Sequence, residues 1–361
     1  MSWAGRLCPA FYAAIAAFAA GAAEGYNVAS DGRATRGSVA QPRDSQEECG
    51  VAMCLVTGGA GFIGSSLARA LAERGDSVRV LDDFSTGKRE NLADLAGKVT
   101  VIVGSVADAA AVREAVRGVD FVFHHGALAS VPRSIDDPLG THEANATGTV
   151  TLLVAARDAG VKRIVYAASS SAYGDQPELP KVETMAPSPL SPYAVSKLAA
   201  EYYCQAFTAC YGLETVCLRY FNIYGPRQDP QSVYAAVIPR FIVAMLAGER
   251  PVIYGDGEQS RDFTFIEDCV AANLLAATAP KAAGQTVNIA CGKRYSLNDL
   301  AALLNKILGT AIEAVHEPAR KGDVKHSQAS IAAARRLLGF RPRFAFEQGL
   351  RKTVDWFRGS S

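Results

Sequence analysis

From about residue 51 onward, the hydrophobic positions of the chain alternate between two patterns. Short β-branched runs predict strands, and amphipathic stretches with helical spacing follow them, which is typical of successive βα units in a parallel sheet. The strands predicted in the first half are Met53–Thr57, Ser77–Leu81, Val99–Val103, Phe121–His124, Arg163–Ala167 and Thr215–Leu218. Gly75 and Gly160 follow two predicted helices, Phe62–Arg74 and Asn145–Ala159, as C-terminal caps. We therefore predict a Rossmann-type α/β fold with a doubly wound parallel sheet.

The pattern changes after Tyr224. Residues 225–230 read GPRQDP, a turn-rich break, and shorter helices and isolated strands follow it, such as Pro251–Tyr254 and Thr286–Ile289. We predict a sheet domain over residues 51–224 and a smaller α/β substrate-binding region over residues 225–361, whose strands could return to the sheet. Such a region would close over the strand ends, where open α/β sheets bind their ligands.

The first fifty residues do not fit the βα pattern. Leu7–Ala23 is a run of apolar residues after Arg6, too short for a typical membrane span and similar to a secretory signal. Residues 27–50 are polar and without periodicity, and Met53 stands just before the first motif. We interpret residues 1–50 as an extension without a folded role, not as a working export signal or anchor, and expect a cytoplasmic protein.

Composition restricts the class of partner. Lys and Arg number 37 and Asp and Glu 36, so the net charge is +1 and no basic surface for nucleic acid or anionic membranes is indicated. The 8 cysteines have no Cys-x-x-Cys spacing, and we expect buried thiols in a reducing compartment. His124 and His125 lack metal-ligand spacing. We predict packing roles for these histidines, or support of a ligand-contacting residue, and no metal site.

A glycine-rich turn joins the first predicted strand to its helix. Gly58, Gly61 and Gly64 flank Phe62 and Ile63 in the sequence GGAGFIG. The first glycine permits a tight turn, the second lets a pyrophosphate approach the backbone, and the third lets the helix pack on the strand. The N-terminus of the helix supplies partial positive charge. The spacing and position predict a dinucleotide site.

Asp82 follows the second predicted strand, about twenty residues after the glycine turn. A carboxylate at this position hydrogen-bonds the ribose diol of the adenosine and repels a 2′-phosphate, which favours NAD over NADP. Lys88 and Arg89 are a contrary hint, because a cation nearby could accept that phosphate. We give Asp82 more weight, since it stands at the strand end itself.

Tyr193 and Lys197 are spaced i and i+4 on a helix that Pro192 begins, so both lie on one face. Ser169 and Ser170 follow the fifth predicted strand and bring hydroxyls to the same edge of the sheet. Tyrosine has a pKa of about 10, so action as a base near neutral pH needs a drop of about three units, or about 4 kcal/mol. Lys197 and a positively charged nicotinamide ring together could lower the pKa of Tyr193 in this way.

These motifs together resemble the extended short-chain dehydrogenase/reductase superfamily and its NAD-dependent epimerase/dehydratase family. They are GGAGFIG, Asp82, SSSAYG, YAVSK and RYFNIYG, in this order, and the resemblance extends over residues 53–357. Within the family the chain is most similar to UDP-sugar 4-epimerases, in particular those that act on UDP-N-acetylglucosamine. The resemblance implies that Tyr193 removes the proton of the sugar 4-hydroxyl while hydride passes to NAD, and that hydride then returns to the opposite face. It also implies that Ser169, or Ser170 as second choice, hydrogen-bonds the same oxygen and that Lys197 binds the nicotinamide ribose.

The resemblance implies further ligand contacts. For the cofactor they are Ser85, Thr86, Gly87, Ser105, Val106, Ala127 and Leu128, with Ser105 at a position where relatives usually carry Asp. For the UDP-sugar, Arg261 and Arg320 would hold the diphosphate, with Asn222 donating to the phosphates. Further candidate substrate contacts are Ser130, Arg133, Asn145, Ser169, Ser170, Gln228, Asp323 and Ser327. Ser327 matches a gate where a bulky aromatic side chain would exclude an N-acetyl group, although this serine could equally cap a helix.

Several alternatives stay open. UDP-glucose or a UDP-uronic acid could be the substrate, because Arg133 or Lys325 could meet a carboxylate. A dehydratase is disfavoured, since Ser170–Ala172 carries no carboxylate where such enzymes typically need an acid/base pair. A non-catalytic NAD-binding regulator is disfavoured by the retained Ser169, Tyr193 and Lys197. The resemblance also implies a homodimer formed through the helices at Asn145–Ala159 and Tyr193–Tyr211.

Overall fold

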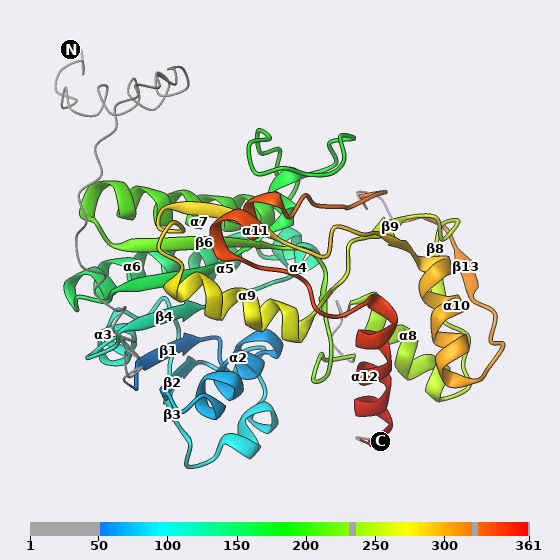
Figure 1. Ribbon diagram of the computed structural model, residues 1–361, viewed down its shortest axis with the longest axis horizontal. Helices are drawn as coiled ribbons and strands as arrows, with labels where there is room; N and C mark the ends of the chain where they lie inside the picture. Colours follow the sequence, from blue (N-terminus) through cyan, green and yellow to red (C-terminus); the bar gives the residue numbers. More distant parts are fainter. Residues whose placement is uncertain (1–50, 231–235, 320–323, 360–361) are drawn as a thin grey trace, which may run out of the picture. The chain divides into compact units, whose positions relative to one another are not determined.

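The computed structural model describes residues 51–230, 236–319 and 324–359. The strands of its main sheet are β1 (Met53–Thr57), β2 (Ser77–Asp82), β3 (Val99–Val103), β4 (Phe121–His124), β5 (Arg163–Ser169), β6 (Glu214–Tyr220) and β11 (Gln285–Ile289). All pairings are parallel, and the order is β11-β6-β5-β4-β1-β2-β3 (Figure 1). The chain reverses direction across the sheet between β1 and β4, and open α/β sheets bind ligands outside the carboxyl ends of strands at such a point.

Helices cover both faces of this sheet. The larger ones are α2 (Phe62–Glu73), α3 (Ala109–Ala115), α6 (Gly148–Asp158), α7 (Pro192–Tyr211) and α9 (Ile266–Thr278). Alternate residues of β1 point to opposite faces, so Cys54 and Val56 share a core with α2 and α9, and Leu55 shares a second core with α6 and α7. Two covered faces explain why the strands read as continuous apolar runs. The predicted Rossmann-type fold is confirmed.

The remaining elements follow or connect these layers. Three two-stranded sheets pair β7 (Ile223–Tyr224) with β10 (Thr264–Phe265), β9 (Ser260–Arg261) with β12 (Tyr295–Ser296), and β8 (Val252–Tyr254) with β13 (Val315–Glu317). The other helices are η1 (Arg89–Leu95), α4 (Val131–Asp136), α5 (Pro138–His142), η2 (Glu143–Thr147), η3 (Ser170–Tyr173), α8 (Val237–Leu246), α10 (Leu297–Leu308), α11 (Ala332–Leu338) and α12 (Phe346–Gly359). Two elements from residues 225–361 return to the main sheet. Strand β11 pairs with β6 at its edge, and helix α9 packs on one of its faces. The sequence analysis had allowed for strands that return in this way.

Some boundaries differ from the predicted ones in ways that matter for the site. Strand β2 includes Asp82, and β5 continues to Ser169, so both side chains are fixed by the sheet itself. The helix predicted to begin at Asn145 instead starts with η2, a π-helical turn, and α6 then ends at Asp158. Wider turns of this kind are frequent at functional sites.

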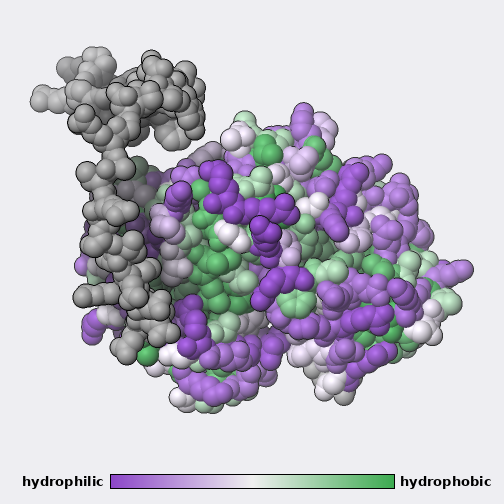
Figure 2. Space-filling model, in the orientation of Figure 1, coloured by the Kyte–Doolittle hydropathy of each residue, from purple (hydrophilic) through white to green (hydrophobic). Residues whose placement is uncertain are grey.

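The described surface is largely polar in the view of Figure 2, with an apolar area over α9. No helix in the described ranges is long and apolar enough to cross a membrane. Of the cysteines in these ranges, four are buried, Cys291 is part-buried, and Cys210 is exposed on α7, so the expectation of buried thiols is wrong for Cys210. The predictions for residues 1–50, including Leu7–Ala23, lie outside the described residues.

Candidate active site

A cavity of about 380 Å³ lies at the carboxyl ends of the central strands. It is lined by every residue that the sequence analysis assigned to the cofactor: Gly58, Gly61, Phe62, Ile63, Gly64, Asp82, Ser85, Thr86, Gly87, Ser105, Val106, Ala127, Leu128, Tyr193 and Lys197. These residues come from five separate segments of the chain. The fold therefore brings the glycine turn, the carboxylate and the Tyr–Lys pair to one place.

The glycine turn leaves no room for side chains. Gly58 has φ +65°, and a Cβ there would lie 2.7 Å from the nitrogen of Gly126. A Cβ on Gly64 would lie 2.1 Å from the carbonyl oxygen of Gly58, so α2 packs directly on the turn. Gly61 caps α2 without a side-chain hydrogen bond. The first N–H groups of α2 are thus available to an anion such as a pyrophosphate.

Asp82 is held at the end of β2 by the backbone around it. One carboxylate oxygen accepts from the nitrogen of Ala60 at 2.9 Å, and the other accepts from that of Phe84 at 2.8 Å. Burial raises the pKa of this carboxyl above its usual value. The two cations that argued for NADP have other partners: Lys88 pairs with Asp229 at 3.0 Å, and Arg89 lies 4.1 Å over the ring of Phe84.

The candidate catalytic residues converge from β5 and α7. Ser191 caps α7 by accepting from the nitrogen of Ala194 at 3.1 Å, which starts the helix immediately before Tyr193. Burial raises the pKa of Tyr193, whereas its hydrogen bond with Ser169 lowers it. Lys197 is almost fully buried, with its ammonium nitrogen 4.4 Å from the centre of the Tyr166 ring. Burial also lowers the pKa of Lys197 to about 8.

The two candidate serines differ in their surroundings. Ser169 ends β5, and its hydroxyl accepts from the backbone nitrogen of Ser171 at 3.2 Å and from the hydroxyl of Ser171 at 2.8 Å. Ser170 begins η3 instead. Because Ser169 also interacts with Tyr193, the geometry favours Ser169 over Ser170 as the serine beside the base.

Two aromatic side chains are among the residues of the cavity wall that were not predicted as ligand contacts. His125 and Tyr220 line the cavity, and their rings stack with centroids 6.0 Å apart and planes 3° apart. Burial lowers the pKa of His125 to about 3, so its ring is neutral. His124 has the predicted packing role, since Thr57 and Thr149 bind its two ring nitrogens. The alternation of side chains along a strand could have distinguished the two histidines. Successive residues point to opposite sides, so His125 must face away from the layer in which His124 packs.

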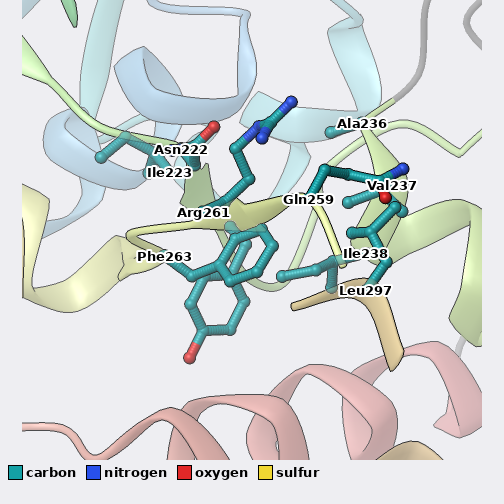
Figure 3. A pocket seen from close by; sticks show the side chains of 10 residues that line it. Asn222, Ile223, Ala236, Val237, Ile238, Gln259, Arg261, Phe263 and Leu297 are labelled. Carbon is teal, nitrogen blue, oxygen red and sulfur yellow. The ribbon is translucent and has the colours of Figure 1, made fainter. Parts of the chain in front are cut away.

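A second pocket, of about 240 Å³, combines an apolar wall with an amide and a cation. It is lined by Asn222, Ile223, Tyr224, Ala236, Val237, Ile238, Gln259, Arg261, Phe263 and Leu297 (Figure 3). In this view Asn222 and Arg261 lie across the pocket from Ala236 and Val237. Asn222 has φ +41°, and its amide donates to the carbonyl of Asp262 at 3.1 Å. An apolar wall beside a guanidinium suits a planar base linked to a phosphate.

Two other predicted substrate residues, Asn145 and Ser130, do not line either pocket. Asn145 is almost fully buried; its amide binds the backbone of Leu128 in both directions and donates to Ser196 at 3.0 Å. Asn145 is not among the residues that line the cavity, and its bonds position Leu128, which does line it. Ser130 caps α4 by accepting from the nitrogen of Arg133 at 3.2 Å.

Four further candidates lie around the second pocket or outside the described residues. The amide nitrogen of Gln228 donates to the carbonyl of Ile223 at 3.1 Å, while its buried side-chain oxygen has no partner among the described residues. The backbone nitrogen of Ser327 donates to the carbonyl of Ser260 at 3.0 Å, which fixes it beside β9. Arg320 and Asp323 lie outside the described residues. The described ranges contain no group of three His, Cys, Asp or Glu that could hold a metal ion.

The protein has a Rossmann-type sheet, a glycine turn at its first strand and a Ser–Tyr–Lys group at the same cavity. These features define an enzyme that uses a nicotinamide dinucleotide. Residues 54–290 match the NAD dependent epimerase/dehydratase family, and the chain belongs to this family. It is similar to a UDP-glucose 4-epimerase of Mycolicibacterium smegmatis, with 39% identity over 316 residues, 85% of this chain and 99% of the relative.

Solved structures support the same assignment. The fold is similar to that of a UDP-N-acetylglucosamine 4-epimerase from Methanobrevibacter ruminantium in complex with UDP-N-acetylmuramic acid, with TM-score 0.83, 40% identity and coverage of 86% of this chain and 99% of that chain. It is also similar to a Thermus thermophilus UDP-glucose 4-epimerase in complex with NAD, with TM-score 0.79, 37% identity and coverage of 86% and 100%. The predicted family, the NAD cofactor and the isomerase class are confirmed.

Proposed function

We propose that this UDP-sugar 4-epimerase acts on an N-acetylhexosamine and interconverts UDP-N-acetylglucosamine and UDP-N-acetylgalactosamine. The observation that carries the epimerase chemistry is the placement of Tyr193 and Lys197 on the wall of the cavity that the glycine turn and Asp82 also line, with Ser169 hydrogen-bonded to Tyr193. The choice of sugar is supported by the small side chain of Ser327, whose backbone nitrogen donates to the carbonyl of Ser260, the residue before Arg261.

Each residue of the candidate site has its own role in the proposed reaction. Tyr193 takes the proton of the sugar 4-hydroxyl, and Ser169 hydrogen-bonds the same oxygen. Lys197, one helical turn after Tyr193, would supply the positive charge that favours the ionised tyrosine against the effect of burial. Bound NAD supplies a hydride acceptor that can return the hydride to either face of the sugar. Asn222 and Arg261 would retain the UDP while the 4-keto sugar turns over.

The cofactor would be NAD and not NADP, because Asp82 occupies the ribose end of the cavity and accepts two backbone N–H groups there. A 2′-phosphate would meet this carboxylate directly. The contacts assigned to Asn145, Arg320 and Asp323 remain proposals from the resemblance.

Other nucleotide sugars are the alternatives for this site. Curated relatives include UDP-glucose 4-epimerases and a UDP-glucuronate 4-epimerase of Thermodesulfobacterium geofontis, which is 33% identical over 314 residues. A dehydratase is less well supported, because the residues after Ser169 are Ser170, Ser171 and Ala172, without a carboxylate.

We also propose that the protein is a homodimer that pairs through α6 and α7. These helices expose Val154 and the α7 residues Val195, Tyr202, Tyr203 and Tyr211, each between 37% and 56% exposed. Large apolar side chains gathered on one surface typically mark an interface. Light scattering during size exclusion should give twice the mass of the chain, and Tyr203→Glu should shift the mass toward the monomer.

The test of the function uses the full chain, purified without added NAD and supplied separately with UDP-N-acetylglucosamine and UDP-glucose. We expect the 4-epimer of each sugar to be distinguishable by proton NMR and a higher kcat/KM for the N-acetylated substrate. A higher kcat/KM for UDP-glucose would overturn the proposed sugar. A 4-keto-6-deoxy product, or no turnover with NAD bound, would overturn the epimerase reaction.

A further inference from the structure

A buried carboxylate directly follows β9, the strand whose Arg261 lines the second pocket. Asp262 follows β9, is 0% exposed, and accepts three backbone hydrogen bonds. One oxygen accepts from the nitrogen of Cys291 at 2.8 Å, and the other accepts from those of Gly292 at 3.0 Å and Ala329 at 3.2 Å. The donors come from two segments that are distant from Asp262 in the sequence.

The segment that carries Asp262 and the segment that carries its donor Ala329 each include a candidate substrate residue. Arg261 precedes Asp262 directly, and the carbonyl of Asp262 accepts from the amide of Asn222 at 3.1 Å. Ala329 is two residues after Ser327, whose own nitrogen donates to the carbonyl of Ser260 at 3.0 Å. The candidate contacts Arg261, Asn222 and Ser327 thus all lie next to Asp262: Arg261 precedes it, Asn222 donates to its backbone carbonyl, and Ser327 is on the segment that Ala329 ties to its carboxylate.

The charge of Asp262 suits this role. Burial raises the pKa of Asp262 to about 6, so the carboxyl is still ionised at neutral pH and both oxygens accept hydrogen bonds. Hydrogen bonds to a charged acceptor are worth more than neutral ones, and leaving a buried N–H without its acceptor costs about 1–3 kcal/mol. Three such donors make Asp262 an energetically costly residue to replace.

We propose that Asp262 is a positioning residue for the UDP-sugar, which fixes Arg261, Asn222 and Ser327 relative to one another. This inference rests on the proposed function. Asp262 and its three donors lie outside the residues that line the NAD cavity, so its effect falls on substrate affinity and not on the cofactor.

The chain offers a matched control in Asp268. This residue is also 0% exposed, and its carboxylate accepts from the backbone nitrogens of Arg343 at 2.9 Å and Phe344 at 3.3 Å. These bonds tie the first turn of α9 to the segment before α12, and none of the three residues lines either pocket described above. Removing this charge disturbs the fold in a similar way without touching the substrate residues.

The experiment compares Asp262→Asn with Asp268→Asn in the full chain. Calorimetry measures the affinity for UDP and for NAD, and steady-state kinetics measures KM and kcat for the UDP-sugar that is turned over. We expect Asp262→Asn to weaken UDP binding and raise KM by about tenfold or more, with kcat and NAD affinity changed by less than about threefold. Asp268→Asn should lower the melting temperature but leave UDP affinity within about twofold.

Equal UDP affinity in wild type and Asp262→Asn would overturn the inference, as would parallel losses of UDP affinity in both variants. If Asp262→Asn does not fold, Asp262→Glu, which keeps the charge but displaces its oxygens, is compared with Asp268→Glu in the same assays. UDP binding is measured without turnover. A failure of the proposed sugar specificity therefore leaves this test intact, and a failure of this test leaves the epimerase proposal intact.

Discussion

The carboxylate of Glu201 on α7 accepts hydrogen bonds from the guanidinium of Arg219 on β6 at 2.7 and 2.9 Å, and both side chains are almost fully buried. Glu201 is one helical turn after Lys197. The guanidinium carbon of Arg219 lies 4.8 Å from the centre of the Tyr173 ring in η3. The ion pair therefore connects the helix of Lys197 to the strand and turn beside Ser169.

Replacement of Glu201 by Gln should destabilise the protein. It leaves the buried guanidinium of Arg219 without its counter-charge, which typically costs about 3–5 kcal/mol in the free energy of unfolding. Because Glu201 raises the pKa of Lys197, its loss should also lower that pKa further. Denaturant unfolding measures the first effect, and the pH dependence of turnover measures the second.

The control for this variant is the double replacement Glu201→Met and Arg219→Met. It removes both charges together, and buried pairs replaced by apolar residues of similar volume are often neutral in stability. We expect it to recover most of the loss. A double variant as unstable as Glu201→Gln alone would mean that the loss does not arise from an unpaired charge.

Replacement of Tyr193 by Phe should remove the base without removing the cofactor site. We expect turnover to fall by about 10²-fold to 10⁴-fold, the usual contribution of a positioned acid or base, with NAD affinity nearly unchanged. Tyr220→Phe is the matched control, since Tyr220 also lines the cavity and donates its hydroxyl to Asn273 at 3.0 Å. Full activity of Tyr193→Phe would exclude Tyr193 as the base.

Much of this site follows from the sequence, because its residues stand at strand ends. Hydrophobic patterning places Asp82 and the Ser169–Ser170 pair there, the resemblance then favours Ser169, and parallel strands bring their carboxyl ends to one edge. Asn145 is different: the helical spacing around it continues through η2, so nothing local reveals the π-turn or the bonds to Leu128. In the sequence, Asp262 is indistinguishable from an ordinary exposed carboxylate in a turn. Its burial depends on Cys291 and Ala329, which only the tertiary structure brings to it.

The pKa of Lys197 predicts a pH dependence. Burial lowers this pKa to about 8 from the ordinary 10.5, and bound NAD, with its positive ring, should lower it further. If the ammonium is needed beside Tyr193, kcat/KM should fall as pH rises through about 8 or slightly below. Lys197→Arg, which stays charged, should lack this alkaline limb at whatever activity it retains.

The same shift has a consequence for stability. Between pH 8 and 10.5 the unfolded chain binds the proton of Lys197 more tightly than the folded protein does. The free energy of unfolding contributed by this group therefore rises with pH across that window. Unfolding of the NAD-free protein should show a steeper rise with pH for the wild type than for Lys197→Met. Equal slopes would contradict a lowered pKa.

Ser327 lies on a segment that is fixed on both sides. Its nitrogen donates to the carbonyl of Ser260, and the ring of His326 hydrogen-bonds the hydroxyl of Ser260 at 2.9 Å. Two residues further on, Ala329 donates to buried Asp262. A larger side chain at this position cannot easily be accommodated by backbone movement, so it should occupy the space available to the sugar.

Ser327→Tyr should therefore discriminate against the bulkier sugar. Loss of room for one small group is worth about 1–3 kcal/mol, so kcat/KM for UDP-N-acetylglucosamine should fall by at least about tenfold, and that for UDP-glucose by less. Ser327→Ala keeps a small side chain and should leave the ratio of the two values unchanged. Equal losses for both sugars in Ser327→Tyr would mean that Ser327 does not limit the space beside the N-acetyl group, and that specificity is set elsewhere in the substrate site.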